Sequence, residues 1–152
     1  MMALMCDLTV PTTMPSCRAM ASIELAAAPD DVWSLIGQFG GAWHPGIARI
    51  RLNGDGVGQL STIASLDGKE VVERLDAIDN AKRFLRYTNI AGIAAARYTG
   101  MLEEKPKGSG CIADWRAQFL ANDQPDIVVK GIVLTWVKSR LESLRPRFGV
   151  AK

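Results

Sequence analysis

The feature that most constrains the fold is the C-terminal segment, predicted to form one long helix from about Pro125 to Arg147. Pro125 and Asp126 suit its start, because a missing N–H costs nothing there and a carboxylate complements the helix dipole. The first half of the segment is apolar on most sides, so the helix must be docked on a sheet or wrapped by one. Gly131 in its middle makes the helix about 1 kcal/mol less stable than alanine at that position would. Close packing, or space for something else, would explain that glycine.

Seven earlier segments are predicted to be strands, because they alternate in polarity between turn signals. They are Ser16 to Leu25, Ile47 to Asn53, Gln59 to Leu66, Lys69 to Ala77, Arg83 to Ile90, Ala96 to Glu104 and Cys111 to Leu120. Asp67-Gly68 is a signal for a type I′ hairpin turn, and Gly54 to Gly58 reads as a hairpin tip rather than a phosphate-binding loop, because it opens no helix. Consecutive hairpins imply an antiparallel sheet.

Two short helices are expected between the first and second strands. Pro29 opens the first, and a broken helical piece is predicted over Phe39 to Trp43. The order of elements predicts an α+β fold, in which a curved, antiparallel seven-stranded sheet is wrapped around the long C-terminal helix.

Glu73 is the most informative residue for function, because it is predicted to point inward. Successive side chains of a strand face opposite sides, and the side with Val71 and Leu75 also carries Glu73. An ionised carboxylate in a dry core is costly, so its pKa is expected to lie above the usual value. Arg74 and Arg86, the obvious nearby cations, fall on outward positions. Either a buried partner meets Glu73, or the interior holds a cavity with polar spots.

Length and composition are those of one globular domain. Of 152 residues, 48% are hydrophobic and 22% charged. Residues 16–149 are expected to form the domain, and residues 1–15 a disordered or mis-annotated lead-in. A net charge of +2 with no run of basic residues does not indicate a nucleic-acid-binding surface. No apolar stretch is long enough for a membrane span, which favours a cytoplasmic protein.

The residue types that bind metals are scarce. Cys6, Cys17 and Cys111 are an odd number without metal-like spacing, which suggests a reducing compartment. His44 is the single histidine. No metal or nucleotide cofactor is therefore expected.

The order and spacing of several motifs resemble the START-like superfamily, also called SRPBCC. It includes the polyketide cyclase/dehydrase family, the birch pollen allergen family and the plant abscisic acid receptors. The matching residues lie between Ser16 and Phe148 and include Ala28 to Trp33, Phe39 to Gly41, Trp43 to Pro45, Gly56 to Gly58, Glu73 to Leu75, Arg83, Tyr87, Tyr98, Trp115, Phe119 and Asp126 to Gly131.

The resemblance implies a helix-grip fold with a hydrophobic cavity between sheet and helix. By resemblance to the abscisic acid receptors, His44 falls near the position of a cationic group that holds a ligand carboxylate. Glu73 matches their inward carboxylate, and Tyr98 matches their pocket tyrosine. The gating loop of the receptors is not matched by Ala91 to Ala96, and their helix asparagine is replaced by Ile132. A cavity of roughly 300–1,000 Å³ is typical of ligand sites. The residues expected to line it are Trp43, His44, Glu73, Tyr87, Tyr98, Trp115, Phe119, Val128 and Ile132.

Some of these residues have a second interpretation. Trp43-His44-Pro45 is either a packed turn or an aromatic wall with a titratable donor at the pocket mouth. Trp115 and Phe119 are either core or cavity wall. Tyr87 and Tyr98 fall on inward positions, where each hydroxyl needs a partner. Gly100 is expected to leave room next to Tyr98.

The leading functional hypothesis is binding of a small hydrophobic molecule that is aromatic, polyketide or lipid-like. The alternative is a cyclase or dehydratase of lyase type, in which Glu73 is the acid or base and His44 or Tyr98 donates to an oxyanion. A third possibility is a protein–protein module that uses the basic residues Lys138, Arg140, Arg145 and Arg147, which otherwise form a solvated face. The protein is expected to be a monomer or a homodimer.

Overall fold

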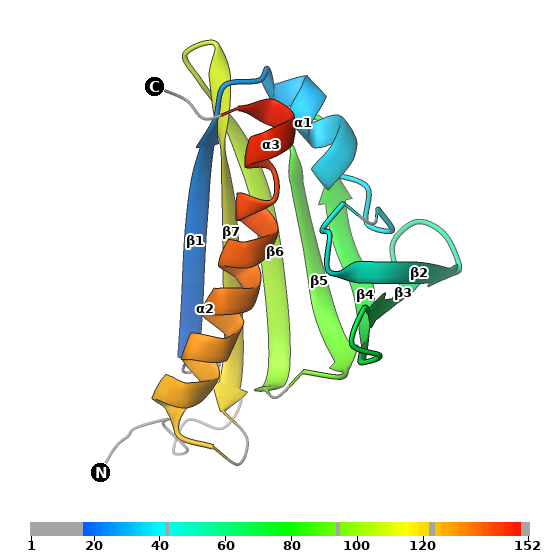
Figure 1. Ribbon diagram of the computed structural model, residues 1–152. Helices are drawn as coiled ribbons and strands as arrows, with labels where there is room; N and C mark the ends of the chain where they lie inside the picture. The colour runs from blue at the N-terminus through cyan, green and yellow to red at the C-terminus, as the bar shows by residue number, and fades with distance from the viewer. Residues whose placement is uncertain (1–16, 42, 94, 122–123, 150–152) are drawn as a thin grey trace.

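The computed structural model describes residues 17–41, 43–93, 95–121 and 124–149. Seven strands and one long helix dominate it (Figure 1). The elements in chain order are β1 (Cys17–Leu25), α1 (Pro29–Ile36), β2 (Ile47–Asn53), β3 (Leu60–Ser65), β4 (Glu70–Asp79), β5 (Phe84–Ala91), β6 (Ala95–Lys107), β7 (Gly110–Ala121), α2 (Asp126–Glu142) and α3 (Arg145–Phe148). The expected α+β fold with a seven-stranded sheet is confirmed.

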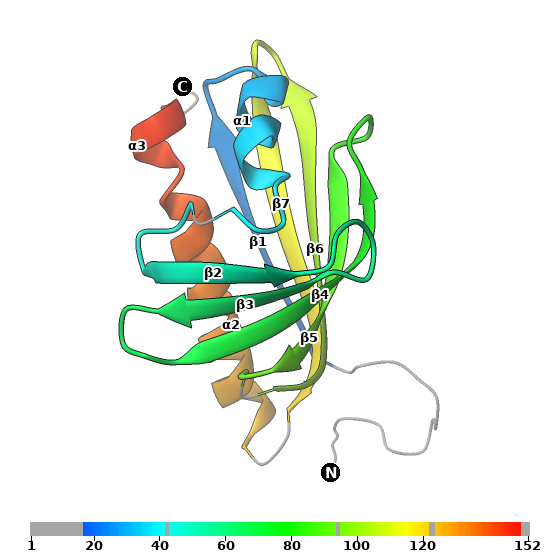
Figure 2. The ribbon, with the colours of Figure 1, turned by 90° about the vertical axis from the view of Figure 1, so that its right-hand side faces the viewer.

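The strands form one antiparallel sheet in the order β1-β7-β6-β5-β4-β3-β2. Strands β2 to β7 are joined in sequence, and β1 pairs with β7 over its whole length. The sheet curves so strongly that β2 and β3 run across the direction of β1 and β7 (Figure 2). Helix α2 lies along the concave face and packs on β1 and β7. Beside Glu73 of β4 and Tyr87 of β5, the inner face is lined by Phe39 and Trp43, which lie between α1 and β2.

Alternation along the strands creates the core. Buried and exposed residues alternate without a break in β1, and every second residue of β7 from Cys111 to Phe119 is buried. Helix α2 contributes Val129, Val133 and Val137, which recur every four residues and so lie on one face. The packing of this face on the sheet holds the helix in place.

Two predictions about helices are wrong. The described residues of Phe39 to Trp43 do not form the expected second short helix, and Phe39 and Gly40 lie in a turn. The long helix ends at Glu142, and α3 follows after a short break. Pro146 explains the break, since it has no N–H to donate to the carbonyl of Glu142 and its ring would clash with that carbonyl.

The predicted turn type at Asp67-Gly68 is also wrong. A type I′ turn needs positive φ at both central residues, but here only Gly68 has it, at 87°. The Gly68 N–H donates to the carbonyl of Ser65 at 3.0 Å, and the Ser65 N–H to the carbonyl of Lys69 at 2.9 Å. The hairpin is closed instead by a longer turn, with glycine at the left-handed position.

Candidate functional site

Glu73 lies on the concave face of β4, as predicted, and its side chain is only 4% exposed. Its neighbours across the sheet are Ser61 on β3 and Asn89 on β5. The Ser61 hydroxyl is fully buried and has no hydrogen-bond partner among the described residues. The Asn89 amide donates to the backbone carbonyls of Val72 and Ala91. These two neighbours of Glu73 on the sheet are thus polar, but neither carries a positive charge that would pair with its carboxyl group.

Arg140 of α2 is the second buried charge, at 6% exposure. Its guanidinium carbon lies 4.5 Å from the ring centroid of Trp115, 5.2 Å from that of Trp43 and 5.5 Å from that of Trp136. Indole faces attract cations, and this stabilises a guanidinium that has left water. The three tryptophans come from β7, the α1–β2 segment and α2, so Arg140 joins three parts of the fold.

Glu73 and Arg140 line the same space but do not form a direct ion pair. Among the described residues, no carboxylate lies within 4.0 Å of the Arg140 guanidinium, and Glu73 Oε2 and Arg140 Nε both lack a hydrogen-bond partner. Burial raises the pKa of Glu73, and the charge of Arg140 opposes this rise only in part. The predicted direction of the pKa shift agrees with this geometry.

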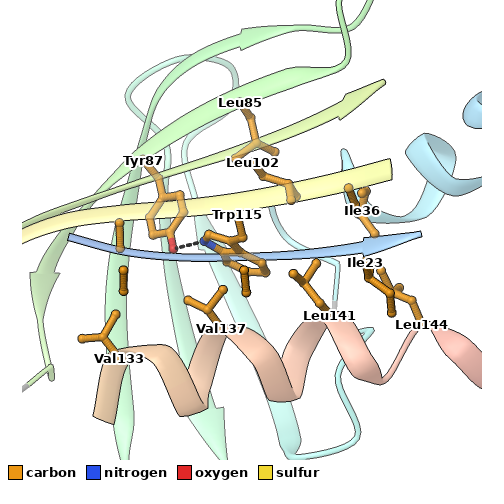
Figure 3. Close-up of a cluster of buried hydrophobic side chains, with 14 of the residues drawn as sticks. Ile23, Ile36, Leu85, Tyr87, Leu102, Trp115, Val133, Val137, Leu141 and Leu144 are labelled. Carbon is orange, nitrogen blue, oxygen red and sulfur yellow. Dashed lines mark hydrogen bonds between the residues drawn. The ribbon is translucent and has the colours of Figure 1, made fainter. Parts of the chain in front are cut away.

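Tyrosine and tryptophan side chains form a hydrogen-bonded network beside Glu73. The Trp115 indole N–H donates to the Tyr87 hydroxyl at 3.0 Å, as Figure 3 shows. That hydroxyl lies 3.3 Å from the Tyr98 hydroxyl, and the Tyr98 ring stacks on Phe119. Burial raises the pKa of Tyr98 to about 12 and that of Tyr87 well above its ordinary value. Both hydroxyls therefore stay protonated at neutral pH and can act as donors.

The space at this site is small. Its volume is about 20 Å³, and it is lined by Phe39, Trp43, Tyr87 and Trp115 together with Glu73 and Arg140. One water needs roughly 10–15 Å³, so a cavity of the expected size does not lie beside Glu73. Arg140 and Trp43 fill the space, and the Tyr87 ring occupies the room above Gly100, where an added Cβ would lie 2.3 Å from Cζ of Tyr87.

His44 lies at the edge of this site and does not line the space that contains Glu73. Its Nδ1 accepts from the Gly46 N–H at 2.9 Å, so its Nε2 carries the proton and donates to the Ser139 hydroxyl at 3.0 Å. Burial and the charge of Arg140 lower the pKa of His44. His44 is therefore neutral at pH 7, and it links the α1–β2 segment to α2.

The other expected pocket residues differ in position. Tyr98 and Phe119 are buried, but they do not line the space at Glu73. Val128 and Ile132 are 43% and 48% exposed, because α2 turns its other face to β1 and β7. The prediction that these two residues line a cavity together with Glu73 is wrong, because neither lines the space at Glu73.

The sequence interpretation missed Arg140, which was grouped with a solvated basic face. A signal was present, because Arg140 continues the stripe of Val129, Val133 and Val137 at helical spacing. Neighbouring Trp136 also carries a buried indole N–H without an acceptor in the described part of the chain. The α2 side of the site thus offers hydrogen-bond donors in excess.

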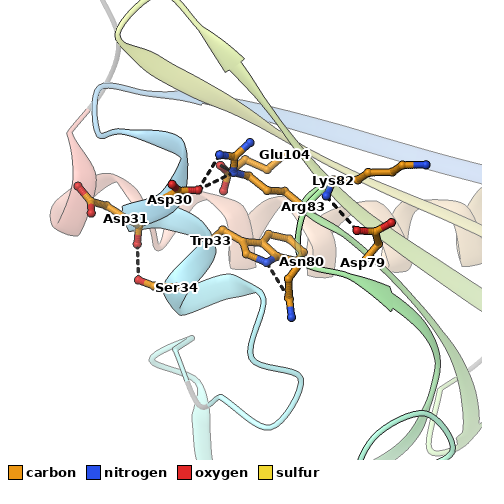
Figure 4. Close-up of polar contacts among 9 residues, drawn as sticks. All are labelled: Asp30, Asp31, Trp33, Ser34, Asp79, Asn80, Lys82, Arg83 and Glu104. Atoms are coloured by element: carbon orange, nitrogen blue, oxygen red, sulfur yellow. Dashed lines mark hydrogen bonds and ion pairs between the residues drawn. The ribbon is translucent and has the colours of Figure 1, made fainter.

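A second buried carboxylate, Glu104 of β6, lies near α1. Its side chain is 1% exposed, and its Oε1 is 3.7 Å from Arg83 Nε (Figure 4). Arg83 also donates to Asp30 of α1 at 2.6 Å. Burial raises the pKa of Glu104 to about 7 despite Arg83. Because Arg83 contacts both carboxylates, this cluster attaches α1 to the sheet.

No cluster of His, Cys, Asp and Glu that could hold a metal ion occurs in the described ranges. In the same ranges, no helix has the length and apolar character needed to cross a bilayer.

These features define a class of protein: a helix-grip domain with buried charged and aromatic residues between its sheet and its long helix. The family model described as "Polyketide cyclase / dehydrase and lipid transport" matches residues 16–146, and the chain belongs to this family. The fold that the START-like resemblance implied is thus confirmed.

Solved structures show the same fold. The protein XoxI from Bacillus cereus has a TM-score of 0.81 and 23% identity, covering 87% of this chain and 95% of its own. A protein from Thermobifida fusca has a TM-score of 0.77 and 27% identity, covering 87% and 93%. Ara h 8.0201 has a TM-score of 0.70 and 17% identity, covering 86% and 95%. No curated protein matches the chain.

Proposed function

We propose that this protein binds a small hydrophobic molecule between α2 and the concave face of the sheet, with the polar end of the ligand at Glu73 and Arg140. One observation carries the proposal: a carboxyl group and a guanidinium, both over nine-tenths buried, line one aromatic-walled space without pairing directly. Buried polar groups without partners are costly, so a protein that needed only stability would gain from replacing them. The family's description, which includes lipid transport, fits the same function.

Binding requires the site to expand, because about 20 Å³ cannot hold a ligand. The segment between α1 and β2, which carries Phe39 and Trp43, is the part that can move away. Trp43 lies 6.1 Å from Trp115 between ring centroids and also contacts Arg140. An aromatic ligand ring would take the place of the Trp43 indole against Trp115 and Arg140. The contacts of the ligand ring with these two residues would offset the contacts that Trp43 loses.

NMR titration with a panel of aromatic acids, polyketide-like phenols and fatty acids tests this proposal. We expect a binding compound to shift the indole N–H signals of Trp43 and Trp115, with the Trp33 signal as internal control. The Trp33 indole N–H donates to Asn80 (Figure 4), and Trp33 does not line the space that contains Glu73. If every compound that binds shifts only signals of exposed residues, the proposed site is wrong.

The second candidate function is a cyclase or dehydratase of lyase type. The raised pKa of Glu73 suits a general acid or base, and the Tyr87 hydroxyl lines the same space and can donate to an oxyanion. In this enzyme mechanism, Tyr87 rather than His44 or Tyr98 would donate the hydrogen bond to the oxyanion. Turnover of an aromatic polyketide that is lost in Glu73→Gln, while binding is retained, would favour the enzyme over the binding protein.

A further inference from the structure

The chemistry of the ligand's polar end can be inferred from the charges around Arg140. Its guanidinium is a cation, and the residue is buried, at 6% exposure. Three indole faces contact it, but in the described part of the chain no carboxylate lies within 4.0 Å. Stacking on indole faces does not use the in-plane donors of a guanidinium, and the buried Arg140 Nε–H has no acceptor among the described residues.

Glu73 does not compensate this charge well. It lines the same space, yet its burial favours the neutral form in spite of Arg140. The other groups around it are the Tyr87 and Tyr98 hydroxyls, which stay neutral, and the Ser61 hydroxyl. His44, the remaining titratable group, is held neutral and donates to Ser139. When Glu73 is protonated, the site carries one uncompensated positive charge.

We propose that the ligand is a weak acid with an aromatic or other apolar body, whose anion pairs with Arg140 while Glu73 takes up a proton and donates it to the second oxygen of that anion. This inference rests on the proposed function and names the ligand class for the same site. A planar carboxylate has two oxygens, one for the Arg140 donors and one for the protonated Glu73. The proton comes from solvent, so the bound site is neutral overall.

Two matched probes test the inference: 2-naphthoate and the neutral 2-naphthalenemethanol, which share a ring system. In calorimetry near pH 6, we expect naphthoate to bind at least about tenfold more tightly, the size of a charge-assisted hydrogen bond. Arg140→Gln should remove this preference, measured within the same variant as the ratio of the affinities for naphthoate and for the alcohol. Lys138→Gln, which removes an exposed charge from the same helix, is the control and should keep the preference.

Proton uptake gives an independent readout. Repeating the titration in buffers of different ionisation enthalpy, from about pH 5 to about pH 9, measures protons bound with the ligand. We expect uptake approaching one proton per naphthoate on the alkaline side of this range, and none for the alcohol. Glu73→Gln should abolish the uptake, while His44→Gln should retain it, because His44 is already neutral there.

The outcomes separate the two proposals. If the alcohol binds as tightly as naphthoate, or if Arg140→Gln keeps the preference, the acid-binding inference fails and the proposed function stands. Naphthoate binding without proton uptake also overturns the inference. If neither probe binds, both proposals fail for aromatic ligands. Should Arg140→Gln not fold, Arg140→Lys, which keeps the charge but loses the planar fork, should reduce the preference for naphthoate over the alcohol several-fold.

Discussion

Buried charges determine how individual residues of this protein respond to pH. Glu73 and Glu104 both face the interior, and burial raises the pKa of each. They differ in their partners, because Arg83 contacts Glu104 at 3.7 Å and bridges it to Asp30, whereas Glu73 has no cation at that distance in the described residues. Glu104 is thus part of a structural cluster, and Glu73 is free to respond to a ligand.

We expect Glu104 to make the protein less stable as pH rises. Its pKa in the folded state is about 7 against an ordinary value of 4.5. The folded state therefore binds more protons, and the stabilisation present below about pH 4.5 is lost as pH rises through about 7. That difference corresponds to roughly 3 kcal/mol at most. Glu104→Gln should remove this part of the decline in the free energy of unfolding, measured by urea denaturation at several pH values.

Glu103→Gln is the matched control, because Glu103 is the adjacent residue of β6 and faces outward to Lys105 and Arg116. Exposed ion pairs of this kind contribute little. A pH dependence that is the same in Glu104→Gln and wild type would show that Glu104 is ionised in the folded state at much lower pH.

The residues of the site were predictable to different degrees. Alternation along one strand is enough to place Glu73, because a strand has only two faces. Arg140 reaches Glu73 from α2, and no local pattern in β4 contains that information. Its distance to Trp43 and Trp115 depends on how the helix docks on β1 and β7, which follows from packing of the whole chain.

Helix α2 contains a glycine, Gly131, that has no evident packing role. Gly131 is exposed, and a Cβ added there would have no atom within 4 Å. The close packing considered from the sequence is therefore absent around Gly131 in the described part of the chain. The glycine costs stability without a contact that requires it.

We expect Gly131→Ala to raise the free energy of unfolding by about 0.5–1 kcal/mol, because alanine loses less backbone entropy in a helix. Chemical denaturation followed by circular dichroism measures the change. A destabilised variant would mean that something packs against this position in solution.

Gly100→Ala tests the opposite case in β6. Its Cβ would lie 2.3 Å from Cζ of Tyr87, so the ring would have to move and the Trp115 hydrogen bond would weaken. We expect a loss of about 1–3 kcal/mol, the usual cost of overpacking. An unchanged stability would show that the Tyr87 ring is mobile.

Elements were easier to predict than the turns and breaks between them. All seven strands lie where the alternation placed them, with ends shifted by at most three residues. The turn at Gly68 and the end of α2 at Glu142 depend on single dihedral angles and on one proline. The volume beside Glu73 could not be inferred at all, since it depends on whether side chains from three elements fill it.

The whole molecule consists of two regions that differ in packing. Strands β1 and β7 are held by α2, and their buried residues belong to the main core, which also includes Trp43 of the α1–β2 segment. The buried residues Ile63 and Ala64 of β3 and Val71 of β4 lie outside that core. The bond between His44 and Ser139 ties the α1–β2 segment to α2. Opening of the site should therefore begin by release of this segment.

Removing that tie should make the site open more often without unfolding the molecule. Ser139→Ala deletes the acceptor of the His44 Nε2–H, and a hydrogen bond contributes about 0.5–1.5 kcal/mol. We expect amide hydrogens of residues 43–47 and of β2 to exchange about two- to tenfold faster, while those of β7 exchange as in wild type. Thr135→Ala, an exposed substitution one turn earlier in α2, should change neither set. Equal acceleration in β2 and β7 would mean that the two regions open together, and that access to Glu73 requires global unfolding rather than movement of one segment.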